Sequence, residues 1–523
     1  MKKLKEYLKK FLLSKVFFYI FFTLSFVLIF LYNYIYSNFS NITKDQLLFS
    51  LFSAQGTNSS IIFGGFIYVF FRLLIVYIIF ISIKSFIVKI INYKIFLLLK
   101  IKNKKYKLQL FPFSRAFQNL LIFLFFILSC IYIVLNIGWL SNSRSIKSSF
   151  IETNYVDPKK VNINAPQEKQ NLIFIYAESL ESSFVTSKDG GAFERKIIPN
   201  LEKLALSNVN FSKNDMIGGP TMVSGTSWTS AATIAMTAGV PLKTPVDSNA
   251  YANFDNFLSE TYTLGEVLKA NNYNNYLLVG SDASFGGKKS YFSQHGDYKI
   301  YDYNYAKKHK WIPSDYGVMW GFEDSKLFKF AKKNLKEISK NDKPFNLTMV
   351  TVDTHFVDGY VDKKCDKPFD EAYLNAFHCS DSEIGEFINW LKKQSFYEKT
   401  TVVIVGDHLT MQSNILDMFD VDNPDEYNRS MYNVFINSKI ETDYTKNREF
   451  TSFDLYPTTL AALGFEIDGD KLGLGTNLFS RKKTLSEEFG NNYIDEELNK
   501  ESDFYNENIL GSASFNQMIL NNK

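Results

Sequence analysis

With 523 residues, the chain is too long for one hydrophobic core, and its length predicts two or more structural units. Hydrophobic residues make up 46% of it and charged residues 21%, which excludes both a disordered chain and a protein made only of membrane spans. Three cysteines are too few for a disulfide-rich scaffold. A membrane part joined to a soluble part fits these numbers.

The charge is divided unevenly along the chain. Residues 1–140 carry 17 Lys and Arg against two acids, Glu6 and Asp45, which gives a net charge of +15. Because the whole chain carries +4, residues 141–523 carry −11. This division argues against a nucleic-acid partner, since the basic residues flank hydrophobic segments and the acidic part would repel phosphate backbones.

Three apolar runs are predicted to span a membrane. Residues 16–36 and 117–140 are uncharged and long enough to cross a bilayer as helices, which takes about 20 residues. Residues 61–83 are also long enough but carry Arg72 near the middle, where a charge costs a few kcal/mol unless it is paired or hydrated. Arg72 therefore either contacts a lipid phosphate or a polar cavity, or lies shallower because the boundaries of the span are shifted.

The positions of Lys and Arg predict the orientation of these spans. Six of the first fifteen residues are Lys, and residues 84–115 hold eight Lys and one Arg without an acid, so both segments should stay in the cytoplasm. We therefore expect a multi-pass protein of the inner membrane, with the chain after residue 140 on the periplasmic side and the first span kept as an anchor. Residues 84–110 are either an interfacial helix with Lys on its polar face or a plain cytoplasmic loop.

The remaining chain is expected to form one large domain. Residues 141–170 are polar, contain two prolines and predict a linker after the transmembrane region of residues 1–140. The domain is expected over residues 171–485, followed by a polar acidic tail over residues 486–523. Within the domain, short apolar runs alternate with helical segments, which predicts an α/β fold with a mostly parallel sheet between helices. The predicted strands lie within the segments 171–179, 274–281, 345–355 and 400–408.

Polar residues follow all four of these strands, at the sheet edge where active-site residues of parallel sheets lie, and Ser281 follows the second. Glu178 ends the first strand, His355 follows the third, and Asp407 and His408 follow the fourth after Gly406, which allows the chain to turn. Carboxylate oxygens and one imidazole suit a divalent cation. Taken alone, GDH is a weak motif, and a solvated Asp-His pair would be the favoured interpretation of it.

A hydroxyl-rich segment, residues 218–242, contains a predicted helix over residues 229–238 that Gly239 and Pro241 would end. A hydroxyl at the start of this helix, such as that of Thr229, lies at the positive end of the helix dipole, and a bound cation would lower its pKa further. Such a threonine could act as a nucleophile. The alternative is an ordinary helix cap without chemistry.

Five motifs, in this order, resemble the membrane-bound sulfatase-like branch of the alkaline phosphatase superfamily. They are NLIFIYAESLESSF, GTSWTSAATIAMTAGVPL, LLVGSDASFGGKKSYFSQHG, LTMVTVDTHFVDGY and VVIVGDHLTM. Lipoteichoic acid synthases and lipid A phosphoethanolamine transferases belong to this branch, and the likeness is greatest to the phosphoglycerol transferases of periplasmic glucan synthesis. The resemblance implies an alkaline-phosphatase-like α/β fold outside the membrane, after N-terminal spans.

The resemblance also implies roles for individual residues. It makes Glu178, Thr229, Asp407 and His408 the ligands of one divalent metal ion, Mn²⁺ or Zn²⁺, and Thr229 the nucleophile, with Thr226 as its rival. His355 matches a family histidine that contacts the phosphoryl group or the leaving oxygen.

Four further residues are matched by motif. Lys288 lies where relatives place a basic residue on the donor phosphate, and His295 lies in a matching SQHG motif and is a further candidate for substrate binding. Surface Lys and structural His are the ordinary alternatives. Cys365 and Cys379 match paired cysteines of the relatives and are expected to form a disulfide.

The activity implied is transfer of a glycerol-phosphate headgroup from phosphatidylglycerol, a phospholipid of the membrane, to an extracytoplasmic glycan through a phosphoryl-threonine intermediate. One alternative is phosphoethanolamine transfer to a cell-envelope glycan or lipid. A sulfatase or phosphatase hydrolase is another, although GTSWTSAAT lacks the C/S-x-P-x-R setting of true sulfatases. A non-catalytic scaffold would be expected to have lost one of the four ligands. The glucan-modifying relatives are longer after the catalytic domain, which leaves the acceptor open.

Overall fold

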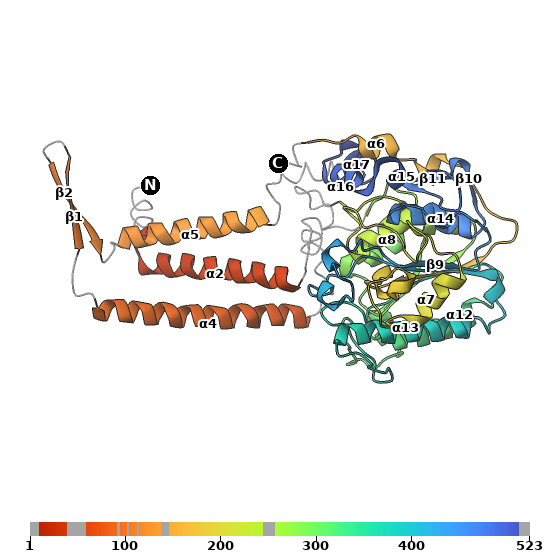
Figure 1. Ribbon diagram of the computed structural model, residues 1–523, viewed down its shortest axis with the longest axis horizontal. Coiled ribbons are helices and arrows are strands. Elements are labelled where there is room, and N and C mark those ends of the chain that lie inside the picture. The colour runs from red at the N-terminus through yellow and green to blue at the C-terminus, as the bar shows by residue number, and fades with distance from the viewer. Residues whose placement is uncertain are drawn as a thin grey trace. The chain divides into compact units, whose positions relative to one another are not determined.

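The computed structural model divides into two compact units, the first within the described residues up to 136 and the second within those from 146 on (Figure 1). The structure describes residues 10–38, 59–90, 95–101, 104–111, 115–136, 146–243 and 257–511.

The first unit contains three helices that are long and apolar enough to cross a membrane. They are α2 (Lys15–Asn38), α4 (Ser59–Ile90) and α5 (Arg115–Asn136). Helix α2 packs against both others, and its Thr23 hydroxyl lies 2.6 Å from the hydroxyl of Tyr77 on α4. The guanidinium of Arg72 lies over the ring of Tyr68, 4.1 Å from its centroid. The prediction of three apolar helices is confirmed.

The segment between α4 and α5 differs from the interfacial helix that was one of the two predictions for residues 84–110. Helix α4 continues to Ile90, and an antiparallel hairpin of β1 (Ile95–Ile101) and β2 (Lys104–Phe111) follows. The prediction of an interfacial helix is therefore wrong from residue 95 on, whereas a cytoplasmic connection between the two apolar helices stays a prediction. The sequence KKYKLQLF of β2 alternates polar and apolar residues, and this period of two favours a strand over a helix.

The second unit is built on a six-stranded sheet with the order β6-β5-β7-β4-β8-β9. Strands β6, β5, β7, β4 and β8 run parallel, and β9 pairs with β8 in the antiparallel direction. The strands are β4 (Asn171–Ala177), β5 (Asn274–Val279), β6 (Lys299–Tyr301), β7 (Phe345–Val350), β8 (Thr400–Gly406) and β9 (Asn433–Ile436). The four predicted strands are the four central ones, and they are buried on both faces.

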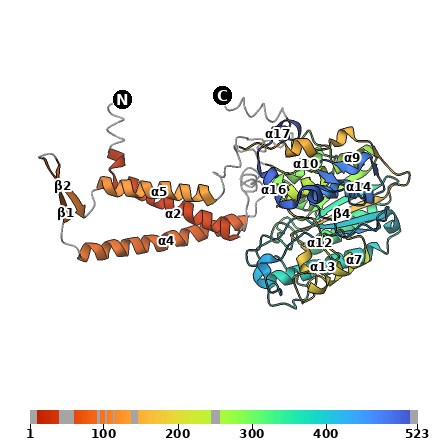
Figure 2. The ribbon, with the colours of Figure 1, turned by 45° about the horizontal axis from the view of Figure 1, so that its top comes forward.

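Helices cover both faces of this sheet (Figures 1 and 2). One face carries α7 (Pro199–Ser207), α12 (Asp324–Ile338) and α13 (Ala372–Leu391), which share a buried core with Ile173 and Ile175 of β4. The other face carries α8 (Thr229–Ala238), α9 (Leu264–Ala270) and α14 (Leu455–Ala462). The expected fold, a mostly parallel sheet between helices, is confirmed.

The remaining elements are short. The helices are α6 (Phe150–Asn154), α10 (Lys288–Gln294), α11 (Tyr303–Lys308), α15 (Leu485–Phe489), α16 (Asn491–Asn499) and α17 (Asp503–Asn508), and the strands are β3 (Ile163–Asn164), β10 (Glu466–Ile467), β11 (Lys471–Leu472) and β12 (Gly475–Thr476). Strand β3 pairs with β10, and β11 pairs with β12.

The expected linker and tail are folded over their described residues. The backbone N–H of Ser148 donates to the carbonyl oxygen of Glu501 at 2.9 Å, and Lys147 forms an ion pair with Asp503 at 2.7 Å. The ring of Phe150 is buried and packs on those of Phe489 and Tyr493. These scattered apolar residues anchor segments whose overall polarity had predicted a linker and a tail.

Candidate active site

The carboxyl ends of β4 and β8 bring two acids together. Ala177 at the end of β4 pairs with Gly406 at the end of β8, so the residues that follow, Glu178 and Asp407, leave the sheet side by side. A side chain at Gly406 would meet the carbonyl oxygen of Leu180 at 1.7 Å. Glycine is therefore required at position 406, where the segments that follow β4 and β8 separate.

Thr229, Glu178, Asp407 and His408 form one cluster. The Thr229 hydroxyl donates to Glu178 Oε2 at 3.2 Å and lies 3.5 Å from His408 Nε2. His408 Nε2 also lies 3.4 Å from Glu178 Oε1 and 3.5 Å from Asp407 Oδ2. The two acids and the histidine are buried, whereas Thr229 is half-buried. Three distant stretches of the chain thus meet around one partly accessible hydroxyl.

Thr229 is the first residue of α8, as the sequence predicted for this helix. The first intrahelical bond runs from Ala232 N to Trp228 O, so the amides at the start of the helix have no intrahelical acceptor and face the end where Thr229 lies. By contrast, the buried hydroxyl of Thr226 donates to Val223 O at 2.7 Å within a local turn. The geometry brings Thr229, and not Thr226, to the cluster.

The polar atoms of the cluster fit a bound cation. Asp407 Oδ1 accepts hydrogen bonds from the backbone N–H groups of Ser179 at 2.8 Å and of His408 at 2.9 Å. Asp407 Oδ2 is buried and accepts no hydrogen bond from any described residue. His408 Nδ1 donates to the carbonyl oxygen of Leu409 at 2.9 Å, so Nε2 faces the two acids. Burial opposes the charge of His408, but the carboxylates of Asp407 and Glu178 raise its pKa to about 10, and a bound cation would replace the proton on Nε2.

The charges of the cluster also favour a bound cation. Burial, together with the nearby charge of Glu178, raises the pKa of Asp407 to about 7. Burial opposes ionisation of Glu178 as well, but the charge and hydrogen bond of His408 bring its pKa down to about 2. Two buried carboxylates so close together are costly unless positive charge compensates them. A divalent cation would supply that charge and stabilise both acids in the ionised form.

His355 and Lys288 lie close enough to the cluster for its charges to act on them. Burial lowers the pKa of His355, with the charges of Glu178, His408 and Lys288 as further influences, so the imidazole is neutral at neutral pH. Its Nδ1 lies 2.7 Å from Phe356 O. Lys288 begins α10 and donates to the carbonyl oxygen of Phe285 at 2.8 Å, and burial lowers its pKa to about 8.

Sequence reasoning missed Trp320. Its ring lies 4.7 Å from that of His355 and 5.6 Å from that of Phe285. Trp320 precedes α12 in a stretch without a helical or strand pattern, where periodicity gives no signal. A tryptophan beside two glycines, Gly317 and Gly321, was the only local feature that could have drawn attention to it.

His295 is held by residues outside the cluster. Its Nδ1 lies 3.1 Å from Glu266 Oε2, and its Nε2 lies 2.7 Å from Phe257 O. The same Glu266 carboxylate accepts the backbone N–H of Thr263 in a capping box at the start of α9. The structure therefore gives His295 contacts that tie α10 to α9 and does not bring it to the other predicted site residues.

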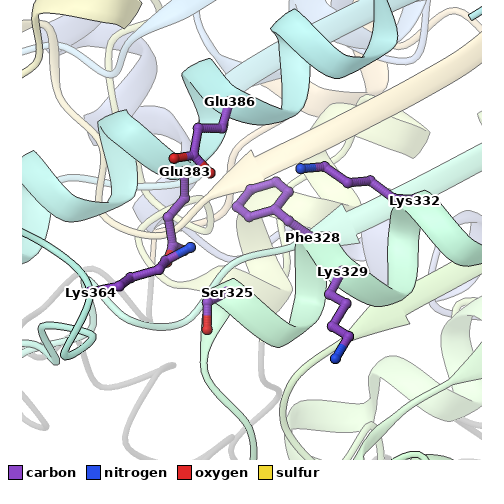
Figure 3. A pocket seen from close by; sticks show the side chains of 7 residues that line it. All are labelled: Ser325, Phe328, Lys329, Lys332, Lys364, Glu383 and Glu386. Atoms are coloured by element: carbon purple, nitrogen blue, oxygen red, sulfur yellow. The ribbon is translucent and has the colours of Figure 1, made fainter.

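A disulfide joins Cys365 to Cys379. The sulfur atoms lie close to the carboxylate of Glu383, which is 2% exposed in its side chain and pairs with Lys364 at 3.3 Å. A hollow of about 270 Å³ opens beside this ion pair, between α12 and α13 (Figure 3). Its lining residues are Ser325, Phe328, Lys329, Lys332, Lys364, Glu383 and Glu386. None of them is a predicted site residue.

The fold and the cluster define a class of protein: an α/β protein of the alkaline-phosphatase-like fold, with an acid, a hydroxyl and an Asp-His pair at the carboxyl edge of its sheet. The family model described as Sulfatase matches residues 170–465. This match covers more than half of the chain, and the chain belongs to the sulfatase family.

Relatives in this family carry a more specific name. Phosphoglycerol transferase I of Xanthomonas campestris pv. campestris (strain B100) is 31% identical over 321 residues, which is 60% of this chain and 43% of the relative. Phosphoglycerol transferase I of Citrobacter koseri is 32% identical over 267 residues, or 50% of this chain and 33% of the relative. The chain thus spans less than half the length of these curated relatives.

Among solved structures, the lipoteichoic acid synthase LtaP from Listeria monocytogenes is similar to this chain with a TM-score of 0.46 and 20% sequence identity. The likeness covers 64% of this chain and 82% of LtaP.

Proposed function

We propose that this protein is a membrane-anchored phosphoglycerol transferase, which moves a glycerol-phosphate headgroup from phosphatidylglycerol to a glycan outside the inner membrane. The identity with proteins named phosphoglycerol transferase I supports the transferred group. The observation that carries the proposal is the Thr229 hydroxyl, half-buried at the start of α8 and within 3.5 Å of both Glu178 and His408. A nucleophile in this position can take up a phosphoryl group and pass it on.

In the first step, the Thr229 oxygen forms a bond to the phosphorus of the lipid headgroup. The bond between that phosphorus and the diacylglycerol oxygen breaks, and the glycerol phosphate remains as an ester on Thr229. Glu178 orients the hydroxyl by accepting its hydrogen bond at 3.2 Å. The amides at the start of α8, which have no acceptor within the helix, favour the negative charge that the phosphoryl oxygens carry.

In the second step, a hydroxyl of the acceptor attacks the same phosphorus, and the bond to Thr229 breaks. We assign proton transfer to His355. Its buried imidazole has a lowered pKa and is neutral before the reaction, so it can accept a proton from the acceptor hydroxyl. In the first step it would take the proton that the Thr229 hydroxyl loses and give it to the departing diacylglycerol oxygen, and in the second step it would pass the acceptor's proton to the Thr229 oxygen. Lys288 would contact the donor phosphate as a point charge.

We assign the metal site to Glu178, Thr229, Asp407 and His408, with Mn²⁺ or Zn²⁺ as the ion. A divalent cation bound there would lower the pKa of the Thr229 hydroxyl and stabilise charge on the phosphoryl oxygens. This assignment is supported by Asp407 Oδ2, which accepts no hydrogen bond from a described residue, and by the inward-facing Nε2 of His408.

The three apolar helices would hold the enzyme at the source of its donor, because phosphatidylglycerol is insoluble and stays in the bilayer. The orientation inferred from the Lys-rich segments puts the domain on the periplasmic side, where the acceptor glycan lies.

The proposal predicts that Thr229→Ala abolishes release of diacylglycerol. The test incubates the purified full-length protein, with Mn²⁺ or Zn²⁺, in detergent with phosphatidylglycerol labelled in its acyl chains, and measures labelled diacylglycerol. We expect wild type to release it and Thr229→Ala to lose at least about 1,000-fold in rate, because removal of a nucleophile leaves only the contributions of binding and electrostatics. Mass spectrometry of the wild-type protein should find glycerol phosphate on the Thr229 peptide.

Thr226→Ala is the matched control, since its hydroxyl contacts only a local turn, and this variant should keep its activity. Full activity of Thr229→Ala with loss in Thr226→Ala would overturn the assignment of the nucleophile. A parallel reaction with phosphatidylethanolamine tests the other headgroup, and faster release from that lipid would replace phosphoglycerol by phosphoethanolamine. Free glycerol phosphate that forms at the same rate with and without glycan would indicate a hydrolase.

A further inference from the structure

Asp324 and Asp353 form a bracket of three hydrogen bonds. Asp324 Oδ1 accepts the backbone N–H of Val352 at 2.9 Å, and its Oδ2 accepts that of Asp353 at 3.0 Å. In return, Asp353 Oδ2 accepts the backbone N–H of Asp324 at 2.9 Å. Both side chains are buried, with relative exposures of 0% and 2%. The bracket therefore fixes two backbone segments to each other through three buried hydrogen bonds.

The two segments carry the rings that meet at the edge of the site. Trp320 lies four positions before Asp324, and His355 lies two positions after Asp353. The ring centroids of Trp320 and His355 are 4.7 Å apart, although 34 residues separate them along the chain. The three hydrogen bonds of the bracket join the start of α12 to the residues that follow β7.

The turn held by Asp324 also contacts the acid of the cluster. The Thr351 hydroxyl accepts the backbone N–H of Glu178 at 2.9 Å, and the Thr354 hydroxyl donates to the carbonyl oxygen of Glu178 at 2.5 Å. The backbone N–H of His355 donates to Val352 O at 3.0 Å and closes the turn. Residues 351–355 are therefore fixed on one side to Glu178 and on the other side to Asp324.

We infer that Asp324 and Asp353 are positioning residues, which set the distance and orientation of His355 and Trp320 relative to Glu178. The inference rests on the proposed role of His355 in proton transfer. Proton transfer requires the donor and acceptor to lie within hydrogen-bond reach, and an error of about 1 Å in such a site can cost about 100-fold in rate. Neither aspartate touches the reacting atoms, so their contribution acts through the loop that they hold.

A buried aspartate that accepts backbone N–H groups is also a common structural cap, and the chain contains a matched example. Asp381 is fully buried on α13 and accepts the backbone N–H groups of Asn200 at 3.1 Å and Leu201 at 2.7 Å. It holds the start of α7, and its hydrogen-bond partners belong to neither the cluster nor the His355 turn. Asp381→Asn therefore disturbs a buried cap of the same kind and serves as the control for stability.

The first experiment is a double-mutant cycle on diacylglycerol release by the full-length protein. Asp324→Asn leaves one carbonyl oxygen for two N–H groups, and we expect kcat to fall by about 10- to 100-fold. In the background of His355→Gln, the same change should cost less than about threefold, because the group it positions is gone. Asp381→Asn should have the same small effect in both backgrounds.

The second experiment measures the surroundings of the Trp320 ring by NMR and needs no enzymatic reaction. It therefore remains informative even if the proposed transfer activity is wrong. The protein is labelled with 5-fluorotryptophan, and the ¹⁹F resonance of Trp320 is identified by its loss in Trp320→Phe. We expect Asp324→Asn to shift this resonance and Asp381→Asn to leave it in place. Asp353→Ala should also shift it, whereas Asp353→Asn should restore the wild-type position, since one carbonyl oxygen suffices to accept the N–H of Asp324.

These measurements separate positioning from stability alone. Equal losses of activity in Asp324→Asn and Asp381→Asn, or additive effects of Asp324→Asn and His355→Gln, would overturn the inference. An unchanged Trp320 resonance in both Asp324→Asn and Asp353→Ala would do the same. If Asp324→Asn does not fold, the pair Asp353→Ala and Asp353→Asn carries both experiments, because Asp353→Ala removes only one hydrogen bond of the three and Asp353→Asn keeps it.

Discussion

Asp407 and His408 each use one polar atom for the backbone and keep the other for the site. In Asp407, Oδ1 accepts two backbone N–H groups and Oδ2 accepts none from the described residues. In His408, Nδ1 faces the carbonyl oxygen of Leu409 and Nε2 faces the two acids. This division orients both side chains before any ligand binds, which lowers the cost of binding.

The metal content of the protein tests the ligand assignment at the level of single residues. We expect Glu178→Gln and Asp407→Asn to lower the bound Mn²⁺ or Zn²⁺ at least about 10-fold in affinity, because each removes a negative ligand next to the ion. The measurement is elemental analysis after equilibration at a fixed free metal concentration. Asp454→Asn is the control, since Asp454 is equally buried but caps a turn by accepting the N–H groups of Thr451 and Thr476. Unchanged occupancy in both cluster variants would contradict the assignment.

Individual residues were predictable from sequence where local pattern constrains them. Glu178 and Asp407 end apolar strands that are buried on both faces, and Thr229 starts a helix with a clear glycine stop, so their positions follow from the chain alone. Trp320 and Asp324 were missed because their partners, His355 and Val352, are reached only through tertiary packing. The periodicity of apolar residues along the chain does not reveal such a tertiary contact.

At the level of elements, the connection from β7 to α13 carries His355 near its start and is closed by the disulfide near its end. Cys365 lies in the connection and Cys379 lies on α13, 14 positions later. The bond therefore fixes the outer part of this connection to the helix that follows it. The bracket of Asp324 and Asp353 fixes the inner part.

Removal of the disulfide should destabilise the domain. For the double variant Cys365→Ser/Cys379→Ser, we expect a loss of about 3 kcal/mol, because a closed loop of about 15 residues restricts the unfolded chain by that amount. Thermal unfolding of the full-length protein measures the effect. Cys130→Ser, in the apolar helix α5, should leave the melting temperature unchanged. A melting temperature of the double variant equal to that of wild type would contradict a stabilising role.

The central strands and α8 were predictable because an apolar run or a capped helix is a strong local signal. The hairpin of β1 and β2 was missed because its Lys content suggested a surface helix, although the alternation in β2 favours a strand. Helices α15, α16 and α17 were missed because only a few apolar residues, such as Ile494 and Leu498, anchor them in an otherwise polar segment.

For the whole molecule, the charge pattern predicts a fixed orientation in the membrane. Cells that express Lys105→Cys or Lys203→Cys, each in a Cys130→Ser background, are treated with a membrane-impermeant maleimide after the outer membrane is opened. We expect Lys203→Cys to be labelled, because this exposed site on α7 lies in the domain assigned to the periplasm, and Lys105→Cys to react only after the cells are lysed. The reverse labelling pattern would invert the assigned topology.

Helix α6 packs on α15 and α16, and Ser148 and Lys147 contact Glu501 and Asp503 near α17. This packing determines how the α/β domain can be produced without the three apolar helices. A recombinant fragment trimmed to the family match, residues 170–465, would lose both sides of this contact, including the buried ring of Phe150 and the ring of Phe489 on which it packs. Expression clones should instead run from residue 146 to residue 511, so that α6 keeps its packing on α15 and α16.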